Sequence, residues 1–256
     1  MSERDRKRRA LSQNFLRTPA VHRYLSLLDV DAEALVLEVG AGDGAITDKL
    51  APKCRELRAN EIDPYHAHKL KERVRRHGNV RVLALDFLAT RPPMEPFTVV
   101  GNVPFSITSK VVEWCIDAPT LTAATIITQF EYAKKRAGSY GRWSLRTVQT
   151  WPWLSWELRG RISRQDFRPV PRVDAGVLHI GRRDRPLIPQ RNRKAYIEMV
   201  SLGFSGIGGS LYRSLIRLYP ANRVAAAFEG AGVASELVVA YVNPEQWVNI
   251  FRSMHR

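Results

Sequence analysis

The chain has 256 residues, 45% of them apolar, and a net charge of +15 from 40 basic and 25 acidic side chains. Its size and apolar content suit a globular protein, and no apolar run reaches the roughly 18 residues of a membrane-spanning helix. Two isolated cysteines are too few for a disulfide framework or a zinc site, which favours a reducing cytoplasm. The positive charge favours a nucleic-acid partner, although an arginine-rich genome could supply part of it.

Residues 1–10 form a predicted basic arm that is separate from the folded part of the chain. Five cations outnumber two acids in this arm: Arg4, Arg6, Lys7, Arg8 and Arg9. We predict that the arm contacts RNA; the alternative is a solubilising tail. A short helix is expected over residues 18–28, with Pro19 in its first turn.

Residues 34–39 show the pattern of a buried strand, and a glycine-rich turn and a helix from Ala45 follow. Strand, glycine turn and helix form the first unit of a nucleotide-binding sheet, because Gly40 and Gly42 let the backbone approach a ligand. The turn carries the acids Glu38 and Asp43 rather than bases. A cationic sulfonium with a free amino group therefore suits this turn better than a pyrophosphate.

Two further strands also end in acids. Glu61 follows Gly42 by 19 residues, close to the spacing at which an acid binds ribose hydroxyls. A strand over residues 80–85 ends at Asp86, which could accept from an adenine amine, and at Phe87, which could flank the ring. Each acid alone could be a solvated strand end, but three in succession after a glycine turn predict an adenosyl site.

The next strand, residues 97–100, stops at Gly101 and leads into Asn102 and Pro104. The proline stiffens this turn, so that the Asn102 amide and the Phe105 ring lie over one small space. An amide oxygen and a neighbouring carbonyl can accept both hydrogens of an exocyclic amine while the ring stacks on its base. The stretch favours nitrogen chemistry on an unstacked nucleobase; the alternative is an ordinary proline turn.

Alternation continues with a helix over residues 109–116, a strand over 121–130 and a helix over 131–137. We assign the tryptophans at 143, 151, 153 and 156 to the core of the last strands of the sheet. A proline-stiffened loop then presents Phe167 between arginines, which suits contact with a base. After a charged hinge at 181–186, helices are predicted over residues 194–202, 211–218, 221–228 and 243–251.

Six segments, residues 12–16, 38–44, 61–63, 86–87, 102–105 and 167–173, follow the motif order of the ribosomal RNA adenine N6-methyltransferases. The chain resembles the erythromycin-resistance (Erm) branch, which uses S-adenosylmethionine to methylate one unpaired adenine of 23S ribosomal RNA and confers macrolide-lincosamide-streptogramin resistance. The resemblance implies an α/β fold with a Rossmann-like S-adenosylmethionine-dependent methyltransferase sheet over residues 11–181. It also implies a small C-terminal helical domain, residues 182–256, that is accessory or binds RNA.

The resemblance also implies roles for single residues, and no metal. Cofactor contacts are expected from Gln13, Asn14, Leu16, Glu38, Gly40, Gly42, Glu61, Ile62, Asp86, Phe87 and Asn102. The target base is expected at Asn102, Val103, Pro104 and Phe105, with Phe167 on its other side. Two positions depart from the family: Phe105 lacks the hydroxyl of the more common tyrosine, and Asp174 begins a stretch, 174–176, that replaces the usual serine or asparagine positions.

Direct in-line methyl transfer without a general base is the expected mechanism. RNA contacts are predicted from the arm and from Lys134, Lys135, Arg136, Arg168 and Arg172. We expect a cytoplasmic monomer that binds 23S RNA before subunit assembly is complete. Two alternatives remain: a housekeeping small-subunit adenine dimethyltransferase, and a non-catalytic RNA-binding or transcription-accessory protein on the same fold.

Overall fold

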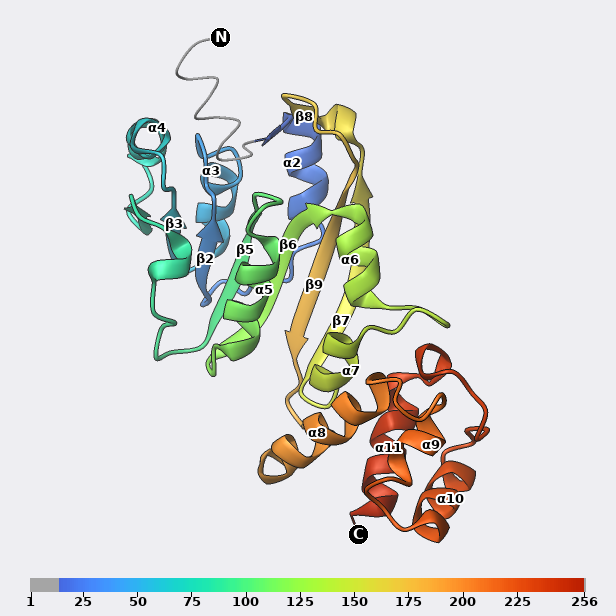
Figure 1. The fold of residues 1–256 in the computed structure, drawn as a ribbon. Helices are drawn as coiled ribbons and strands as arrows, with labels where there is room; N and C mark the ends of the chain where they lie inside the picture. The colour runs from blue at the N-terminus through green and yellow to red at the C-terminus, as the bar shows by residue number, and fades with distance from the viewer. Residues whose placement is uncertain (1–13, 256) are drawn as a thin grey trace. The chain divides into compact units, whose positions relative to one another are not determined.

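The computed structural model describes residues 14–255 (Figure 1). Its main feature is a mixed β-sheet built from strands between residues 35 and 182. Within this range seven strands pair in the order β4 (Val80–Leu83), β3 (Glu56–Asn60), β2 (Leu35–Val39), β5 (Phe97–Asn102), β6 (Leu121–Gln129), β9 (Ala175–Arg182) and β7 (Leu154–Ile162). The first five are parallel to one another, and β9 runs antiparallel to β6. The third strand in this order, β2, is buried along its whole length, as parallel strands covered on both faces are. The predicted α/β sheet is confirmed.

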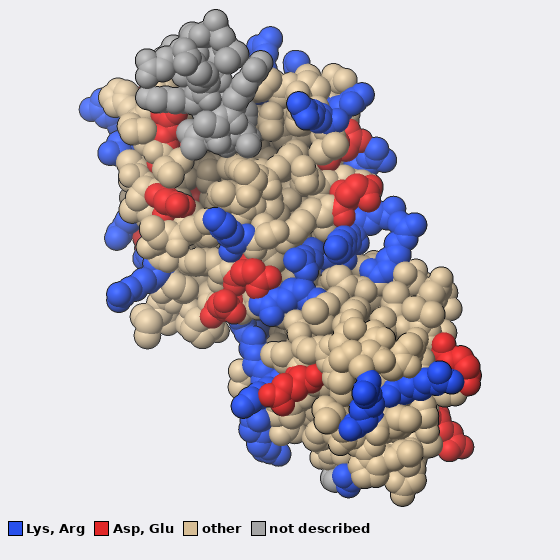
Figure 2. Space-filling view, viewed as in Figure 1, with Lys and Arg blue, Asp and Glu red and all other residues tan. Residues whose placement is uncertain are grey.

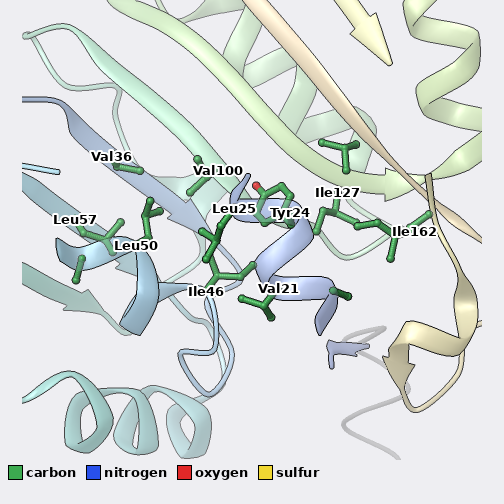
Figure 3. Close-up of a cluster of buried hydrophobic side chains, with 14 of the residues drawn as sticks. Val21, Tyr24, Leu25, Val36, Ile46, Leu50, Leu57, Val100, Ile127 and Ile162 are labelled. Atoms are coloured by element: carbon green, nitrogen blue, oxygen red, sulfur yellow. The ribbon is translucent and has the colours of Figure 1, made fainter. Parts of the chain in front are cut away.

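Helices cover both faces of this sheet. Val21 and Tyr24 of α2 (Thr18–Leu25) pack in one apolar cluster with Val100 of β5, and α3 (Thr47–Leu50) joins them (Figure 3). The ring of Trp114, on α5 (Thr108–Asp117), contacts Phe97 at the other end of β5, 5.8 Å between centroids. Because side chains alternate along a strand, Phe97 and Val100 point to opposite faces, so α2 and α5 sandwich the sheet.

Tyr24 links β5 and β6 through its hydroxyl group. Its hydroxyl accepts a hydrogen bond from the Gly101 N–H (2.9 Å) and donates one to the Thr125 carbonyl (2.6 Å). The side chain is fully buried, and burial raises the pKa of Tyr24 well above its ordinary value. The phenol therefore stays protonated and fixes the backbone where β5 gives way to the predicted catalytic turn.

Two compact units divide the described residues. The first comprises residues 14–133 and 158–181, and the second comprises 134–157 and 182–255. The sequence predicts one boundary after residue 181, whereas the structure groups the segment 134–157 with the C-terminal helices. No helix in residues 14–255 is long and apolar enough to cross a membrane.

The second unit is helical. It contains the end of α6 (Phe130–Ala137) and α7 (Leu145–Thr150), α8 (Arg193–Phe204), α9 (Leu211–Leu215), α10 (Ala221–Gly230) and α11 (Pro244–Met254). Asn243 and Gln246 form a reciprocal capping box that starts α11. The core of the unit includes Trp247, Tyr196 and Phe251, all nearly inaccessible to solvent.

Three of the four tryptophans lie outside the strands of the sheet, contrary to the prediction, whereas Trp156 is buried on β7. The Trp153 ring packs on Tyr196 of α8, and Trp151 donates its ring N–H to Glu245 of α11 (3.1 Å). Of the four, Trp156 alone lies on a strand, β7, in a part of that strand grouped with the second unit. Large aromatic side chains indicate burial but not which core receives them, so the pattern could not separate the two units.

Candidate active site

A cavity of about 180 Å³ opens at the carboxyl ends of β2, β3, β4 and β5, within the first unit. Open parallel sheets place their ligands at this end of the strands. The predicted cofactor and target-base segments line it together. Its walls are Asn14, Phe15, Val39, Gly40, Gly42, Asn60, Glu61, Ile62, Leu85, Asp86, Phe87, Asn102, Val103, Pro104, Phe105, Ser106 and Ile107.

The glycine turn after β2 forms one wall and depends on its lack of side chains. Gly40 and Gly42 have φ angles of +68° and +59°, in the left-handed region that favours glycine. A Cβ added at Gly42 would lie 2.8 Å from the Phe15 ring. A side chain at Gly42 would therefore clash with Phe15, which lines the same cavity.

Glu61 directly follows β3 and is a buried carboxylate in a fixed orientation. Its Oε2 accepts from the Gly42 N–H (2.7 Å) and its Oε1 from the Asp63 N–H (2.8 Å). Each carboxylate oxygen has a further acceptor position. Glu61 also lines the cavity, so this carboxylate can accept two more hydrogen bonds, as vicinal ribose hydroxyls would donate.

Apolar side chains and one carboxylate stand beside Glu61. Ile62 is 51% exposed, and Phe87 is buried against Trp114 with ring centroids 4.5 Å apart. Asp86 is exposed, and its Oδ1 accepts from the Leu88 N–H at 2.9 Å. This part of the cavity suits a flat apolar ring that carries a hydrogen-bond donor.

Asn102 is oriented by a hydrogen bond that its side chain donates to the N-terminal segment. Its Nδ2 donates to the Asn14 carbonyl oxygen at 2.5 Å. A carbonyl can only accept, so the amide nitrogen must face Asn14 and the Asn102 Oδ1 is turned away from it. The Val103 N–H is held by the Ile127 carbonyl (3.1 Å), and the Pro104 carbonyl accepts from the Ile107 N–H (3.0 Å). The turn is thus rigid, with an acceptor oxygen displayed at the cavity.

Three predicted residues do not line the cavity. Glu38 is 1% exposed and accepts from the Thr47 hydroxyl (2.7 Å), while its Oε1 has no hydrogen-bond partner among residues 14–255. Burial raises the pKa of Glu38 to about 8; the Thr47 hydrogen bond opposes this rise and the nearby charge of Glu61 adds to it. Leu16 packs against the core cluster below α2. Glu38 and Leu16 therefore pack in or against the protein interior and are not part of the cavity lining.

Phe167 is the third of these residues. It lies on β8 (Phe167–Arg168), which pairs antiparallel with β1 (Phe15–Leu16), and it is fully buried in the same cluster. Side chains alternate along the two-residue strand, so Phe167 points inward while Arg168 is exposed. The structure thus gives no support for Phe167 as the second face of the base site.

The departure at Asp174 has a structural explanation. The Asp174 carboxylate accepts from the Arg161 guanidinium and from the Arg164 backbone N–H (2.9 Å), which closes the base of the loop after β7. These contacts, the Arg164 hydrogen bond first, lower the pKa of Asp174 below its usual value. The Asp174 carboxylate therefore fixes the start and the end of the loop that contains Phe167, through its contacts with Arg161 and Arg164.

The predicted RNA contacts lie at several places. Lys134, Lys135 and Arg136 form the last turn of α6, and Arg168 and Arg172 are exposed. Gln13 and the cations of the arm fall outside the described residues. On the face drawn in Figure 2, Lys and Arg are widely spread and outnumber Asp and Glu. Whether these groups touch RNA stays a prediction.

The sequence analysis missed Phe15 and Asn60 as cavity residues. Phe15 stands in a segment assigned to the cofactor through its neighbours, and its ring lies 5.1 Å from that of His66. Asn60 directly precedes Glu61 and is 2% exposed, and its Nδ2 has no hydrogen-bond partner among the described residues. A polar residue at the buried end of a strand, directly before a predicted site residue, is the signal that could have found it. Residues 14–255 hold no group of three or more His, Cys, Asp or Glu side chains placed to bind a metal.

Known proteins are similar in sequence to this one along nearly the whole chain. The family model "Ribosomal RNA adenine dimethylase" matches residues 4–256. An rRNA adenine N-6-methyltransferase of Streptomyces fradiae is 53% identical over 252 residues, which cover 97% of this chain and 79% of that protein. The mycinamicin-resistance protein MyrB of Micromonospora griseorubida is 33% identical over 96% of this chain and 78% of its own.

Among solved structures, the 23S rRNA methyltransferase ErmE superposes with a TM-score of 0.91 at 44% identity, covering 94% of this chain and 100% of that one. The predicted resemblance and the Rossmann-like fold are confirmed. The chain therefore belongs to the ribosomal RNA adenine dimethylase family of S-adenosylmethionine-dependent methyltransferases.

Proposed function

We propose that this enzyme methylates N6 of one unpaired adenine in 23S ribosomal RNA and thereby confers macrolide-lincosamide-streptogramin resistance. The observation that carries the proposal is the Asn102 amide, held by Asn14 so that its oxygen is available beside Phe105. The names of similar proteins support the choice of substrate, since ErmE is a 23S enzyme and MyrB a resistance protein.

The chemistry requires that a poor nucleophile be activated. The lone pair of an adenine amine is delocalised into the ring, so a site that favours a pyramidal nitrogen raises its reactivity. The Asn102 Oδ1 accepts one amine hydrogen. The Pro104 carbonyl already accepts from the Ile107 N–H and from the Thr108 hydroxyl, so we assign the second hydrogen to the Val103 carbonyl. Phe105 stacks on the base, and the released proton goes to solvent.

S-adenosylmethionine fits the residues of the cavity. The described lining residues carry two carboxylates, apolar walls and no basic side chain, which suits an uncharged adenosyl group joined to a cation better than a phosphate. When bound, the cofactor supplies a methyl group on positively charged sulfur. We assign the ribose hydroxyls to Glu61, the adenine amine to Asp86, the flanks of the ring to Ile62 and Phe87, and the methionine part to the glycine turn.

Calorimetry of S-adenosylmethionine binding tests the ribose assignment. Glu61→Ala should weaken binding by about 1–3 kcal/mol, the cost of losing hydrogen bonds to a charged acceptor. Glu56→Ala, at the other end of the same strand and outside the cavity, is the matched control and should leave affinity unchanged. Equal affinities for wild type and Glu61→Ala would refute the assignment.

Methyl transfer to purified ribosomal RNA tests the substrate. The enzyme should transfer radiolabelled methyl groups to protein-free 23S RNA and not to 16S RNA. Methylation of 16S RNA would instead identify a small-subunit dimethyltransferase. Cofactor binding without transfer to either RNA would identify a non-catalytic RNA-binding protein.

We further infer that the enzyme acts as a cytoplasmic monomer on RNA that is not yet fully assembled into subunits. A base that must enter a cavity has to be unpaired and accessible, which favours free RNA over the mature subunit. The RNA contacts are assigned to the N-terminal arm, the last turn of α6, Arg168 and Arg172. Transfer to protein-free 23S RNA and to intact large subunits, compared at equal concentration, tests the timing.

A further inference from the structure

Two exposed tyrosines meet on the surface of the second unit. Tyr140 is 75% exposed and Tyr241 is 41% exposed, and their rings contact edge to face with centroids 5.1 Å apart. Tyr140 lies in the loop between α6 and α7, which extends away from both helices in Figure 1. Tyrosine is enriched at binding surfaces, because its ring is apolar while its hydroxyl tolerates water.

The backbone holds Tyr140 at the tip of a defined turn. The Arg142 N–H donates to the Ser139 carbonyl (2.9 Å), and Gly141, the third residue of the turn, has a φ of +75°. This is the pattern of a type II turn, in which the third position requires glycine. A Cβ at Gly141 would also lie 2.9 Å from the Tyr241 ring, so the two tyrosines meet only because that residue is glycine.

The base of the loop is fixed as well. Gly138, with a φ of +76°, ends α6 through a hydrogen bond from its N–H to the Lys134 carbonyl (3.1 Å). A Cβ at Gly138 would lie 2.3 Å from the Trp143 ring, which covers this glycine. Tyr140 is therefore displayed by an ordered loop, so little conformational entropy is lost when a ligand binds it.

Basic side chains flank the loop. Residues 134–157 contain five cations and one acid. Lys134, Lys135 and Arg136 directly precede the loop, and Arg142 follows Tyr140 by two residues. An aromatic platform among cations is the arrangement by which proteins bind single-stranded nucleic acid.

We propose that Tyr140, backed by Tyr241, stacks on an unpaired base of the RNA substrate while the flanking cations contact its phosphates. This surface belongs to the second unit and is built from residues outside the cofactor cavity. The proposal rests on the proposed function, because it takes ribosomal RNA as the ligand. The cations favour RNA over a protein partner.

Binding of the full-length protein to two labelled RNA probes tests the platform. One probe is a hairpin with an unpaired loop, and the other is a fully paired duplex of equal length. Tyr140→Ala should weaken hairpin binding about tenfold, within the range of one lost base stack, without changing the salt dependence. Tyr140→Phe keeps the ring and should bind within about twofold of wild type. Duplex and S-adenosylmethionine binding should not change.

Two controls separate stacking from general surface effects. Leu218→Ala removes another exposed apolar side chain of the second unit, 73% exposed, and should bind like wild type. Lys135→Ala should instead reduce the salt slope of hairpin binding by about 0.7, the value for one phosphate contact.

The proposal fails if Tyr140→Ala binds the hairpin as wild type does, or if it loses hairpin and duplex binding equally. A change in oligomeric state on gel filtration, with unchanged RNA affinity, would assign the pair to a protein contact instead. Methylation of 23S RNA by the wild type is measured in parallel. Absence of methylation would refute the proposed function. Methylation by the wild type together with unchanged hairpin affinity of Tyr140→Ala would refute the platform alone.

Discussion

Asn102 makes two contacts, and two substitutions test whether both are needed. Its nitrogen anchors the Asn14 carbonyl and its oxygen is proposed to accept from the base. Asn102→Ala should abolish methylation while leaving S-adenosylmethionine affinity within about twofold, because other residues hold the cofactor. Asn102→Asp keeps acceptor oxygens but replaces the donor to Asn14 by a repelling charge, so it should also lose activity. Near-wild-type turnover of Asn102→Ala would reduce the residue to a turn former.

Glu38 makes stability depend on pH. Its folded-state pKa is about 8, whereas a carboxyl in an unfolded chain has a pKa near 4.3. The folded state therefore holds the proton more tightly between these values, and the stability that this gives is fully present below the lower value and is lost as pH rises towards 8. Relative to Glu38→Gln, which still accepts from Thr47, the wild type should lose about 1.4 kcal/mol per pH unit inside this window.

Urea unfolding at pH 5, 6, 7 and 8 measures this difference. Glu72→Gln, an exposed carboxyl of α4 (Pro64–Val74), is the matched control for loss of a carboxylate. A difference between wild type and Glu38→Gln that is constant over the four pH values would show that burial does not hold the proton on Glu38.

At the level of elements, β5 requires glycine at position 101. The strand continues through Gly101 to Asn102, whereas the sequence predicts that it stops at Gly101. Gly101 has a φ of +145°, and a Cβ there would lie 2.4 Å from the Val39 carbonyl oxygen of β2. Neither backbone can move without breaking the ladder between the two strands. Gly101→Ala should therefore destabilise the protein by about 3 kcal/mol or more.

Gly230→Ala is the control for this prediction. Gly230 ends α10, and a Cβ added there meets no atom within 4 Å. That substitution should be neutral or stabilise by up to about 1 kcal/mol, since alanine loses less backbone entropy on folding. Thermal or urea unfolding measures the stability of both variants. Similar stabilities would contradict the requirement for glycine at position 101.

Local sequence predicted the elements of the first unit well because parallel strands are continuous apolar runs punctuated by glycine and acids. The expected strand over residues 34–39 is β2 (Leu35–Val39), and Glu61, Asp86 and Asn102 do meet at one cavity. These three side chains stand at the carboxyl ends of neighbouring strands, so sheet topology brings them together.

Side-chain direction and domain membership were beyond local sequence. Phe167 points inward because β8 pairs with β1, a partner about 150 residues away in the chain. Glu38 is buried outside the cavity, where its carboxylate accepts a hydrogen bond from the Thr47 hydroxyl. The segment 134–157 joins the second unit through packing such as Trp153 on Tyr196, which no local pattern records.

At the scale of the whole molecule, the net charge of +15 should govern RNA affinity. Binding should fall steeply with salt, with a slope of about −0.7 per phosphate contact on single-stranded RNA. Deleting residues 1–10 removes five cations and should lower affinity and flatten this slope, while S-adenosylmethionine binding stays intact. A variant of full length with the five cations replaced by glutamine should behave like the deletion. An unchanged slope would favour genome composition as the origin of the arm's charge.

The segment around Phe15 belongs to two surfaces at once. Asn14 and Phe15 line the cofactor cavity and Asn14 binds Asn102, while Phe15 and Leu16 pair with β8 beside the exposed Arg168. RNA lying across β8 would hold this segment in place and so keep the cofactor from exchanging. The two substrates should consequently follow a compulsory order in steady-state kinetics: S-adenosylmethionine enters first, methylated RNA departs before S-adenosylhomocysteine, and the latter inhibits competitively against S-adenosylmethionine alone.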